Sequence, residues 1–277
     1  MKKFLKTWII PPGFISLFSK SVKKSSKLTN EDKKLLAENI LIRDRHQEER
    51  CFILGAGPSI IKQDLSRLRG EYVISVSNTF VHPDYHLFSP KYHVLPPLLA
   101  SHGHLNPSEK WIPWLREMDQ KTPEAEMFLH IGDQELISKN NIFSNKVIHW
   151  CEYYKWDETP ISQIDLSNLP SIWSVSELAI MTALYLGFEK IYLLGIDHDW
   201  FNGPLVYFYD PETQHAMRPD AERLSFADAE FQMRRHAKIF RKYKYLYAIK
   251  ENIYNANANA NHYMDVFPKV DYDSLFI

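Results

Sequence analysis

The sequence contains few cysteines and almost no net charge. Only Cys51 and Cys151 occur among 277 residues, so there is neither a disulfide framework nor the paired spacing of a zinc site. This cysteine usage suits a reducing cytoplasm. The 33 basic and 34 acidic residues give a net charge of −1, which offers no electrostatic basis for a nucleic acid partner.

Long apolar runs are also missing, most notably near the N-terminus. Residues 1–24 place lysines around short aromatic and aliphatic stretches, which Pro11, Pro12 and Gly13 interrupt. The segment is too short to cross a bilayer and lacks the continuous core and cleavage site of a signal peptide. Its pattern suits a basic amphipathic extension on an anionic membrane surface, the alternative being a disordered or core-packed tail. We therefore expect a cytoplasmic protein, with peripheral attachment to the inner membrane as an option.

The bulk composition indicates a soluble globular protein. Hydrophobic residues make up 45% of the chain and charged residues 24%, which is ordinary for a folded domain, and the length suits one large α/β domain. We divide the chain into residues 1–48, the basic segment followed by a linker helix that starts near Thr29, and residues 49–277, a single nucleotide-binding catalytic domain.

A glycine-rich turn follows the first apolar run. Cys51–Leu54 is typical of a buried parallel strand, and the glycines after it allow the backbone to approach a ligand closely. The turn is not a dinucleotide fingerprint, because the third glycine would fall at Ile60, and no P-loop lysine follows. We predict that it binds a nucleotide phosphate through Gly55, Ala56, Gly57, Pro58 and Ser59.

Two more predicted strands end in polar residues. The strand Tyr72–Val76 runs into Asn78, and the strand Lys190–Leu194 runs into Asp197. A helix from about Ser174 precedes the second of these, and strand, helix and strand in this order predict right-handed parallel crossovers. Ligands in such sheets bind beyond the carboxyl ends of the strands. The fold class is therefore α/β: a Rossmann-like, mostly parallel, twisted sheet flanked by helices.

The remaining elements are predicted from composition and spacing. We expect strands at Tyr92–Leu95, Glu126–Ile131 and Lys146–Trp150, helices at Ser108–Gln120 and Phe226–Tyr243, and a last strand at Tyr245–Ile249.

Each candidate site residue has a functional and a structural interpretation. Asn78 could contact ribose or phosphate, or cap a strand end. Asp197 could orient a substrate hydroxyl or bind a metal ion, or cap a turn. His215 could act as a general base, or be solvated in its loop. Ser174 and Ser176 could hold a donor phosphate at a helix start, or serve as a plain N-cap.

Several of these segments resemble known families. The segments that carry the resemblance are Phe52–Ser59, Ser77-Asn78, Ser176–Ala179 and Leu186–Asp197. They are similar to bacterial sialyltransferases that use CMP-sialic acid and to the 6-hydroxymethylpterin pyrophosphokinase-like (MptE-like) proteins, and Asp265–Tyr272 resembles the second group. Ala56 stands where the sialyltransferases have asparagine. The resemblance implies a Rossmann-like nucleotide-binding fold.

Together these patterns favour a glycosyltransferase of bacterial surface-polysaccharide biosynthesis. It would use a nucleotide-activated sugar, with a CMP-sugar as one candidate, and a glycan or lipid-linked acceptor. Asp197 and His215 would then be the catalytic residues; no cofactor is firmly implied, and Mg²⁺ is an option. The first alternative is an MptE-like pyrophosphokinase that transfers diphosphate from ATP, with Mg²⁺ held by Asp197 and Asp199. The second is a non-catalytic nucleotide- or glycan-binding protein.

Overall fold

The computed structural model describes residues 28–101, 107–198, 207–209, 226–258 and 265–276. Contacts divide the chain into a unit of residues 1–34 and a unit of residues 35–277. In the first unit, helix α3 (Asn30–Ala37) begins where Thr29 and Asp32 exchange hydrogen bonds between side chain and backbone. The predicted division lies after residue 48, and the roles of the two parts as separate domains stay a prediction.

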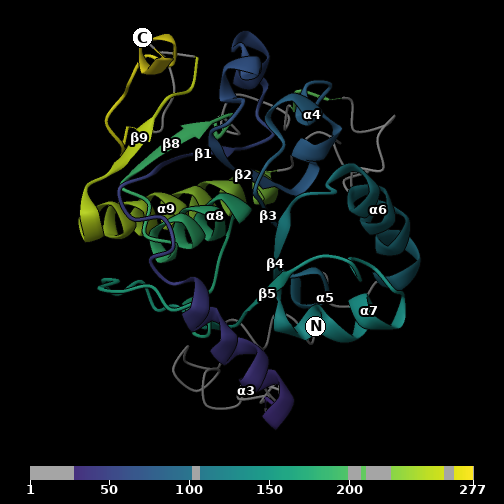
Figure 1. Cartoon of the computed structure of the whole chain (residues 1–277). Coiled ribbons are helices and arrows are strands. Elements are labelled where there is room, and N and C mark those ends of the chain that lie inside the picture. Colours follow the sequence, from purple (N-terminus) through teal and green to yellow (C-terminus); the bar gives the residue numbers. More distant parts are fainter. Residues whose placement is uncertain (1–27, 102–106, 199–206, 210–225, 259–264, 277) are drawn as a thin grey trace, which may run out of the picture. The chain divides into compact units, whose positions relative to one another are not determined.

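The larger unit is built on a seven-stranded sheet in which every strand is parallel to its neighbours. Its spatial order is β5-β4-β3-β2-β1-β8-β9 (Figure 1). The strands are β1 (Arg50–Leu54), β2 (Tyr72–Val76), β3 (Tyr92–Val94), β4 (Glu126–His130), β5 (Ile148–Cys151), β8 (Lys190–Leu194) and β9 (Ile253–Asn255). The sheet and its helices confirm the α/β, Rossmann-like fold class.

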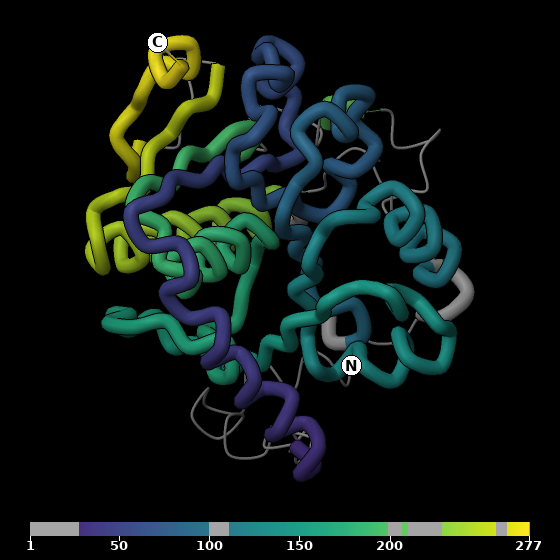
Figure 2. The backbone as a smooth tube through the Cα atoms, viewed as in Figure 1, coloured from purple at the N-terminus to yellow at the C-terminus, as the bar shows by residue number. Residues whose placement is uncertain are grey.

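The direction in which the chain adds strands to the sheet reverses beside β1. The chain adds β2, β3, β4 and β5 outward on one side of β1 and then returns to place β8 and β9 on its other side (Figure 2). The register pairs Leu54 at the end of β1 with Leu194 at the end of β8. In α/β proteins, the usual place of the ligand crevice is such a switch in direction, beyond the carboxyl ends of the two central strands.

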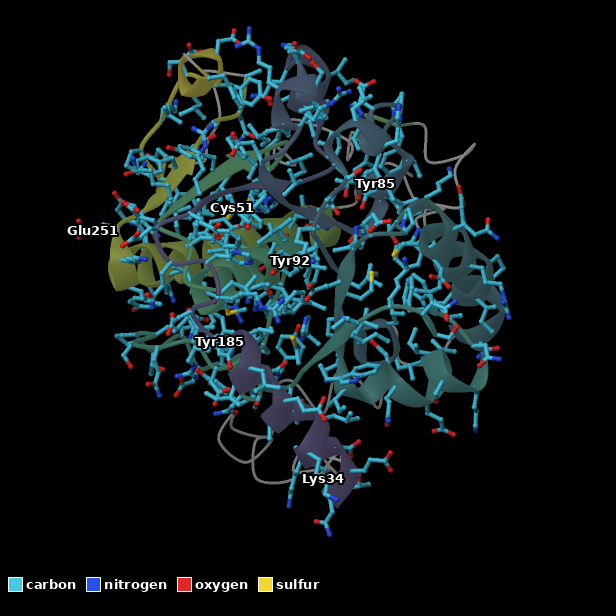
Figure 3. The ribbon with its side chains drawn as sticks, viewed as in Figure 1. Lys34, Cys51, Tyr85, Tyr92, Tyr185 and Glu251 are labelled. Atoms are coloured by element: carbon cyan, nitrogen blue, oxygen red, sulfur yellow. The ribbon has the colours of Figure 1, made fainter. Side chains whose placement is uncertain are left out.

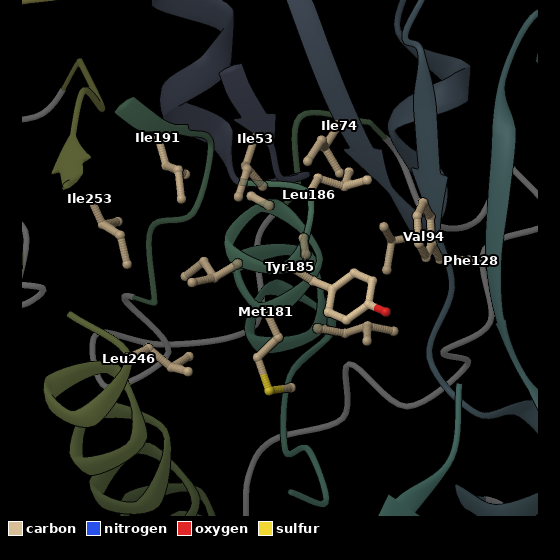
Figure 4. Packing of buried hydrophobic residues seen from close by; sticks show 14 of the residues in the cluster. Ile53, Ile74, Val94, Phe128, Met181, Tyr185, Leu186, Ile191, Leu246 and Ile253 are labelled. Atoms are coloured by element: carbon tan, nitrogen blue, oxygen red, sulfur yellow. The ribbon is translucent and has the colours of Figure 1, made fainter. Parts of the chain in front are cut away.

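Helices α8 (Val175–Tyr185) and α9 (Phe226–Lys250) cover one face of the sheet (Figures 1 and 4). Ile53 and Ile74 from the strands point toward α8, and Met181 of α8 and Leu246 of α9 belong to the same cluster. Almost every residue of α8 is buried, as expected for a helix that is apolar on all sides. This layer holds the start of α8 in a fixed place relative to the strands.

The opposite face of the sheet carries polar groups as well as apolar ones. Ser75 on β2 lies between Tyr85 of α4 (Tyr85–Phe88) and His93 on β3, with Oγ 3.0 Å from the tyrosine hydroxyl and 2.6 Å from Nδ1. Burial lowers the pKa of His93 to about 3, so the ring is neutral. Figure 3 labels Tyr85 among the side chains around the strands.

Three other helices and a small sheet complete the described part of this unit. They are α5 (Leu98–Ser101), α6 (Pro107–Lys121), α7 (Gln134–Lys139) and the pair β6 (Tyr153–Tyr154) and β7 (Leu169–Pro170). Among the described residues, no helix combines the length and apolar character that crossing a membrane requires. The basic segment 1–24 lies outside the described residues, so its attachment to a membrane surface stays a prediction.

One predicted element is wrong. Tyr245–Ile249 was expected to form a strand, but α9 continues through it to Lys250, and the last strand of the sheet is Ile253–Asn255. Ile239, Tyr243 and Leu246 recur at helical spacing and are all fully buried. Burial of this helical face in the core outweighs the local preference for a strand.

A charged cluster fixes the amino-terminal edge of the sheet around Glu126 of β4. Its carboxylate lies 3.0 Å from Arg45, 2.9 Å from Lys91 and 2.7 Å from His149. Partial burial raises the pKa of Glu126, but the hydrogen bonds from His149 and Lys91 and the charges of Lys91 and Arg45 outweigh burial and lower it to about 2.

This cluster predicts a pH-dependent contribution to stability. Because the pKa is lower in the folded chain, the contribution is complete above the ordinary value of 4.5 and is lost as the pH falls toward 2. Glu126→Gln should therefore lower the free energy of unfolding by roughly 1–2 kcal/mol at pH 7, after allowance for solvent screening, and by less at pH 3. Urea titrations at both pH values measure this, with the surface variant Glu117→Gln as control. An equal loss at both pH values would contradict it.

Candidate functional site

The glycine turn after β1 is held against the end of β8. The N–H of Gly55 donates to the carbonyl of Leu194 at 2.8 Å, and the N–H of Gly57 donates to the carbonyl of Gly195 at 2.7 Å. A Cβ atom at Gly55 would overlap the Gly195 carbonyl, and one at Gly57 would lie 2.5 Å from the carboxylate of Asp197. The glycines are therefore required by the close approach of two strand ends, whether or not a ligand is bound.

Asp197 joins the same turn from the β8 side. Its Oδ2 accepts a hydrogen bond of 2.9 Å from the backbone N–H of Ser59, and its Oδ1 accepts one from the Ser59 hydroxyl. Both residues are buried. This arrangement makes Asp197 the residue that locks the turn in place, and its part in a reaction stays a proposal.

Asn78 lies at the carboxyl end of the neighbouring strand β2, in a network of aromatic side chains. The indole N–H of Trp114 on α6 donates to Asn78 Oδ1 at 2.5 Å, and Asn78 Nδ2 donates to the hydroxyl of Tyr209 at 2.8 Å. Because an indole nitrogen only donates, it fixes which end of the amide faces Trp114. The amide is thus oriented before any ligand arrives.

The short segment 207–209 connects Asn78 to the glycine turn. The N–H of Phe208 donates to the carbonyl of Ala56 at 3.2 Å, while Tyr209 binds Asn78. The rings of Tyr207 and Tyr209 stack with centroids 5.0 Å apart. Aromatic faces of this kind can stack on a base or a sugar. The ends of β1, β2 and β8 therefore meet at one place, although they lie far apart in the sequence.

Ser174 is the N-cap of α8 and forms a capping box with Glu177. The carboxylate of Glu177 accepts the N–H groups of Trp173 and Ser174 at 2.6 and 2.7 Å. A side chain with its own negative charge thus occupies the position where a helix start would attract an anion. The geometry favours the capping interpretation of Ser174, and its role as a phosphate ligand stays a prediction.

Ser176 faces a buried polar chain that sequence patterns did not indicate. Its Oγ lies 2.7 Å from the hydroxyl of Tyr243, which lies 2.8 Å from Nε2 of His198. Burial and the charge of Glu177 raise the pKa of Tyr243 well above its usual value. His198 has a positive φ of 50°, which turns its backbone immediately after Asp197. The start of α8 is thereby linked to the end of β8.

Two predicted residues lie outside the described part of the chain. His215 and Asp199 both belong to segments that the structure does not describe, so their roles stay predictions. Among the residues that are described, no three histidine, cysteine, aspartate or glutamate side chains gather as a metal site would require.

A comparison with known family models gives no match, and neither does a comparison with curated proteins. Among solved structures, the chain is similar to the sialyltransferase CstII from Campylobacter jejuni, determined in complex with a substrate analogue, cytidine 5′-monophosphate. The two are 16% identical, with a TM-score of 0.43, and the similarity covers 81% of this chain and 85% of that one. The fold assignment comes from the parallel sheet itself, and the resemblance to sialyltransferases and MptE-like proteins stays a prediction.

Proposed function

We propose that the chain is a transferase that binds a nucleotide-activated sugar, with a CMP-sugar as donor, in the crevice between the ends of β1 and β8. The observation that carries the proposal is the direct bonding of the Gly55–Ser59 turn to Gly195 and Asp197, at the point where the strand order reverses. Among the described residues, the N–H of Ala56 has no hydrogen-bond partner, and it supplies a donor for a phosphate oxygen.

The reaction follows from how such a donor is activated. The oxygen of an acceptor hydroxyl attacks the anomeric carbon, the bond from that carbon to the phosphate oxygen breaks, and CMP leaves with the bonding electrons. The N–H of Ala56 stabilises the charge that grows on the phosphate. Asp197 keeps the turn in position through Ser59, and Asn78 holds the nucleotide. His215 is the candidate base from the sequence, and a glycan or lipid-linked acceptor provides the hydroxyl.

A thermal-shift screen of the full chain with CMP, UDP, GDP and ATP, each with and without Mg²⁺, tests this function. CMP at 100 times its Kd should stabilise the fold by about 2.7 kcal/mol, which raises Tm by roughly 5–10 °C. A response to ATP that needs Mg²⁺, with none to CMP, would favour the pyrophosphokinase instead. A chain that responds to no nucleotide would refute the proposal.

Asn78→Asp provides a sharper version of the same measurement. Aspartate can still accept from Trp114 and from the Tyr209 hydroxyl, so both contacts are kept, but its charge repels a phosphate or the electron-rich edge of a nucleotide. We expect the CMP response to fall at least tenfold in apparent affinity. Asn168→Asp adds the same charge at an exposed position and should leave the response unchanged.

A further inference from the structure

The backbone that follows β8 is held from the side of β9. The two strands pair in register as far as Leu193 and Asn255. The backbone then turns at Gly195, where φ is 62°, so Ile196 lies beyond the paired part of the two strands. Ile196 is nevertheless buried, with only 4% of the residue exposed. Its backbone N–H and carbonyl therefore need partners other than the regular bonds of a sheet.

The amide side chain of Asn257 supplies both partners. Its Oδ1 accepts a hydrogen bond of 3.2 Å from the N–H of Ile196, and its Nδ2 donates one of 3.1 Å to the carbonyl of the same residue. Asparagine suits this position because its side chain carries one acceptor and one donor group side by side, as a strand backbone does. The side chain thus takes the place of one more residue of β9.

The glycine turn is bonded to the other side of the same peptide group. The carbonyl of Gly195 and the N–H of Ile196 belong to one peptide plane. The carbonyl accepts from the N–H of Gly57 at 2.7 Å, and the N–H donates to Asn257. The second bond of Asn257 holds the next peptide plane, which leads directly into Asp197. Asn257 therefore sets the orientation of the two peptide groups that lie behind the glycine turn.

Asn257 is itself held in place by its own segment, which begins the alternating asparagine and alanine repeat of residues 255–261. Its N–H donates to Oδ1 of Asn255 at 3.1 Å, in a turn typical of asparagine. The carbonyl of Ala256 accepts from Nε2 of Gln63 at 2.7 Å, and Gln63 ends the short 3₁₀ helix that begins in the glycine turn. The segment thus contacts the structure around the turn at two places.

We infer that Asn257 is a positioning residue of the nucleotide site, and the inference rests on the proposed binding of a CMP-sugar at the glycine turn. Asn257 acts through the backbone and need not touch the nucleotide. Its amide fixes the Gly195 carbonyl to which Gly57 is bonded, and the turn held in this way presents the N–H of Ala56 to the phosphate. Such support matters because a binding group that moves by about 1 Å loses much of its effect.

Asn257→Ala removes both bonds to Ile196, and calorimetry with CMP at a temperature where the variant is folded measures the result. We expect the Kd for CMP to rise about tenfold, which corresponds to the loss of roughly one hydrogen bond. The reason is that the turn is no longer held in a single orientation. The fall in Tm of the variant is measured in parallel, so that binding and stability can be compared.

Asn252→Ala is the matched control. Asn252 lies directly before β9, and its Nδ2 donates to the carbonyls of Phe188 and Glu189, directly before β8. It makes the same kind of link between the same two strands, but at the opposite edge of the sheet. Because Asn252 is buried, its loss should lower Tm at least as much as Asn257→Ala does. The Kd for CMP should stay within about twofold of the wild-type value.

Asn257→Asp adds a pH dependence that a purely structural role would not produce in CMP binding. An ionised carboxylate accepts from the N–H of Ile196 but cannot donate to its carbonyl, whereas a protonated carboxyl can do both. Since the ordinary pKa of such a carboxyl is about 3.9, the Kd relative to wild type should be about tenfold higher at pH 7 and at most roughly threefold higher at pH 4. Ala258→Asp places the same charge at the neighbouring exposed residue and should match the wild-type chain at both pH values.

Three results would overturn the inference and leave the proposed function intact. They are a wild-type Kd for Asn257→Ala, an equal loss of CMP binding in Asn252→Ala, and a relative Kd for Asn257→Asp that is the same at pH 7 and pH 4. A wild-type chain that does not bind CMP would overturn the proposed function, and the inference with it.

Discussion

Lys242→Met should lower the free energy of unfolding by about 3–5 kcal/mol, because it leaves the buried carboxylate of Glu177 without a countercharge. Lys242 on α9 and Glu177 on α8 are both fully buried, with Nζ 2.8 Å from Oε1. The ammonium group also donates to the carbonyl of Ser171 at 2.6 Å and lies 4.6 Å from the ring centre of Trp156. Urea unfolding followed by circular dichroism measures the loss.

The double variant Glu177→Gln/Lys242→Met distinguishes the effect of an unpaired charge on stability from the effect of changed packing. Glutamine at position 177 can still accept the N–H groups that cap α8, but it carries no charge, so most of the lost stability should return. Lys244→Met, two residues along the helix and exposed, should change stability by less than 0.5 kcal/mol. If the single and double variants were equally unstable, the burial of an unpaired charge would not be the cause.

The second large effect is expected at Gly57. An alanine Cβ there would lie 2.5 Å from the Asp197 carboxylate and 2.7 Å from the Gly195 carbonyl, neither of which can move without breaking the bonds between the turn and β8. Gly57→Ala should therefore cost about 1–3 kcal/mol of stability. It should also weaken CMP binding at least tenfold, as measured by calorimetry, because the turn that presents the Ala56 N–H is displaced.

Ala56→Gly is the matched control for Gly57. It adds flexibility in the same turn and creates no clash, so the expected cost is below about 1 kcal/mol, with CMP binding retained. If Gly57→Ala bound CMP as tightly as the wild-type chain, the turn would not be a phosphate site.

Much of the fold follows from sequence patterns that act locally. The strands that the sequence predicted at Cys51–Leu54 and Tyr72–Val76 are β1 and β2, and the helix predicted from about Ser174 is α8. Tyr245–Ile249 misled the prediction because its aromatic and aliphatic residues suit a strand. Only packing against α8, which is non-local, shows that they belong to a helix.

The candidate site likewise has a part that the sequence predicts and a part that it does not. That Gly55–Ser59, Asn78 and Asp197 share one edge could be predicted, since each follows a parallel strand. Their partners could not, because Trp114 and Tyr209 reach Asn78 across 36 and 131 residues of sequence. The chain from Ser176 through Tyr243 to His198 was also overlooked, because it joins residues 67 and 45 positions apart.

The order of the strands has a consequence for synthesis on the ribosome. Strands β1 to β5 come from residues 50–151, whereas β8 begins only at Lys190, so the growing chain can pair five strands while one long side of β1 is still open. That side is an unpaired, apolar edge, which is prone to join the edge of another chain. A nascent chain stalled before Lys190 would therefore be prone to aggregate and unable to bind a nucleotide. The addition of β8 would remove both defects at once.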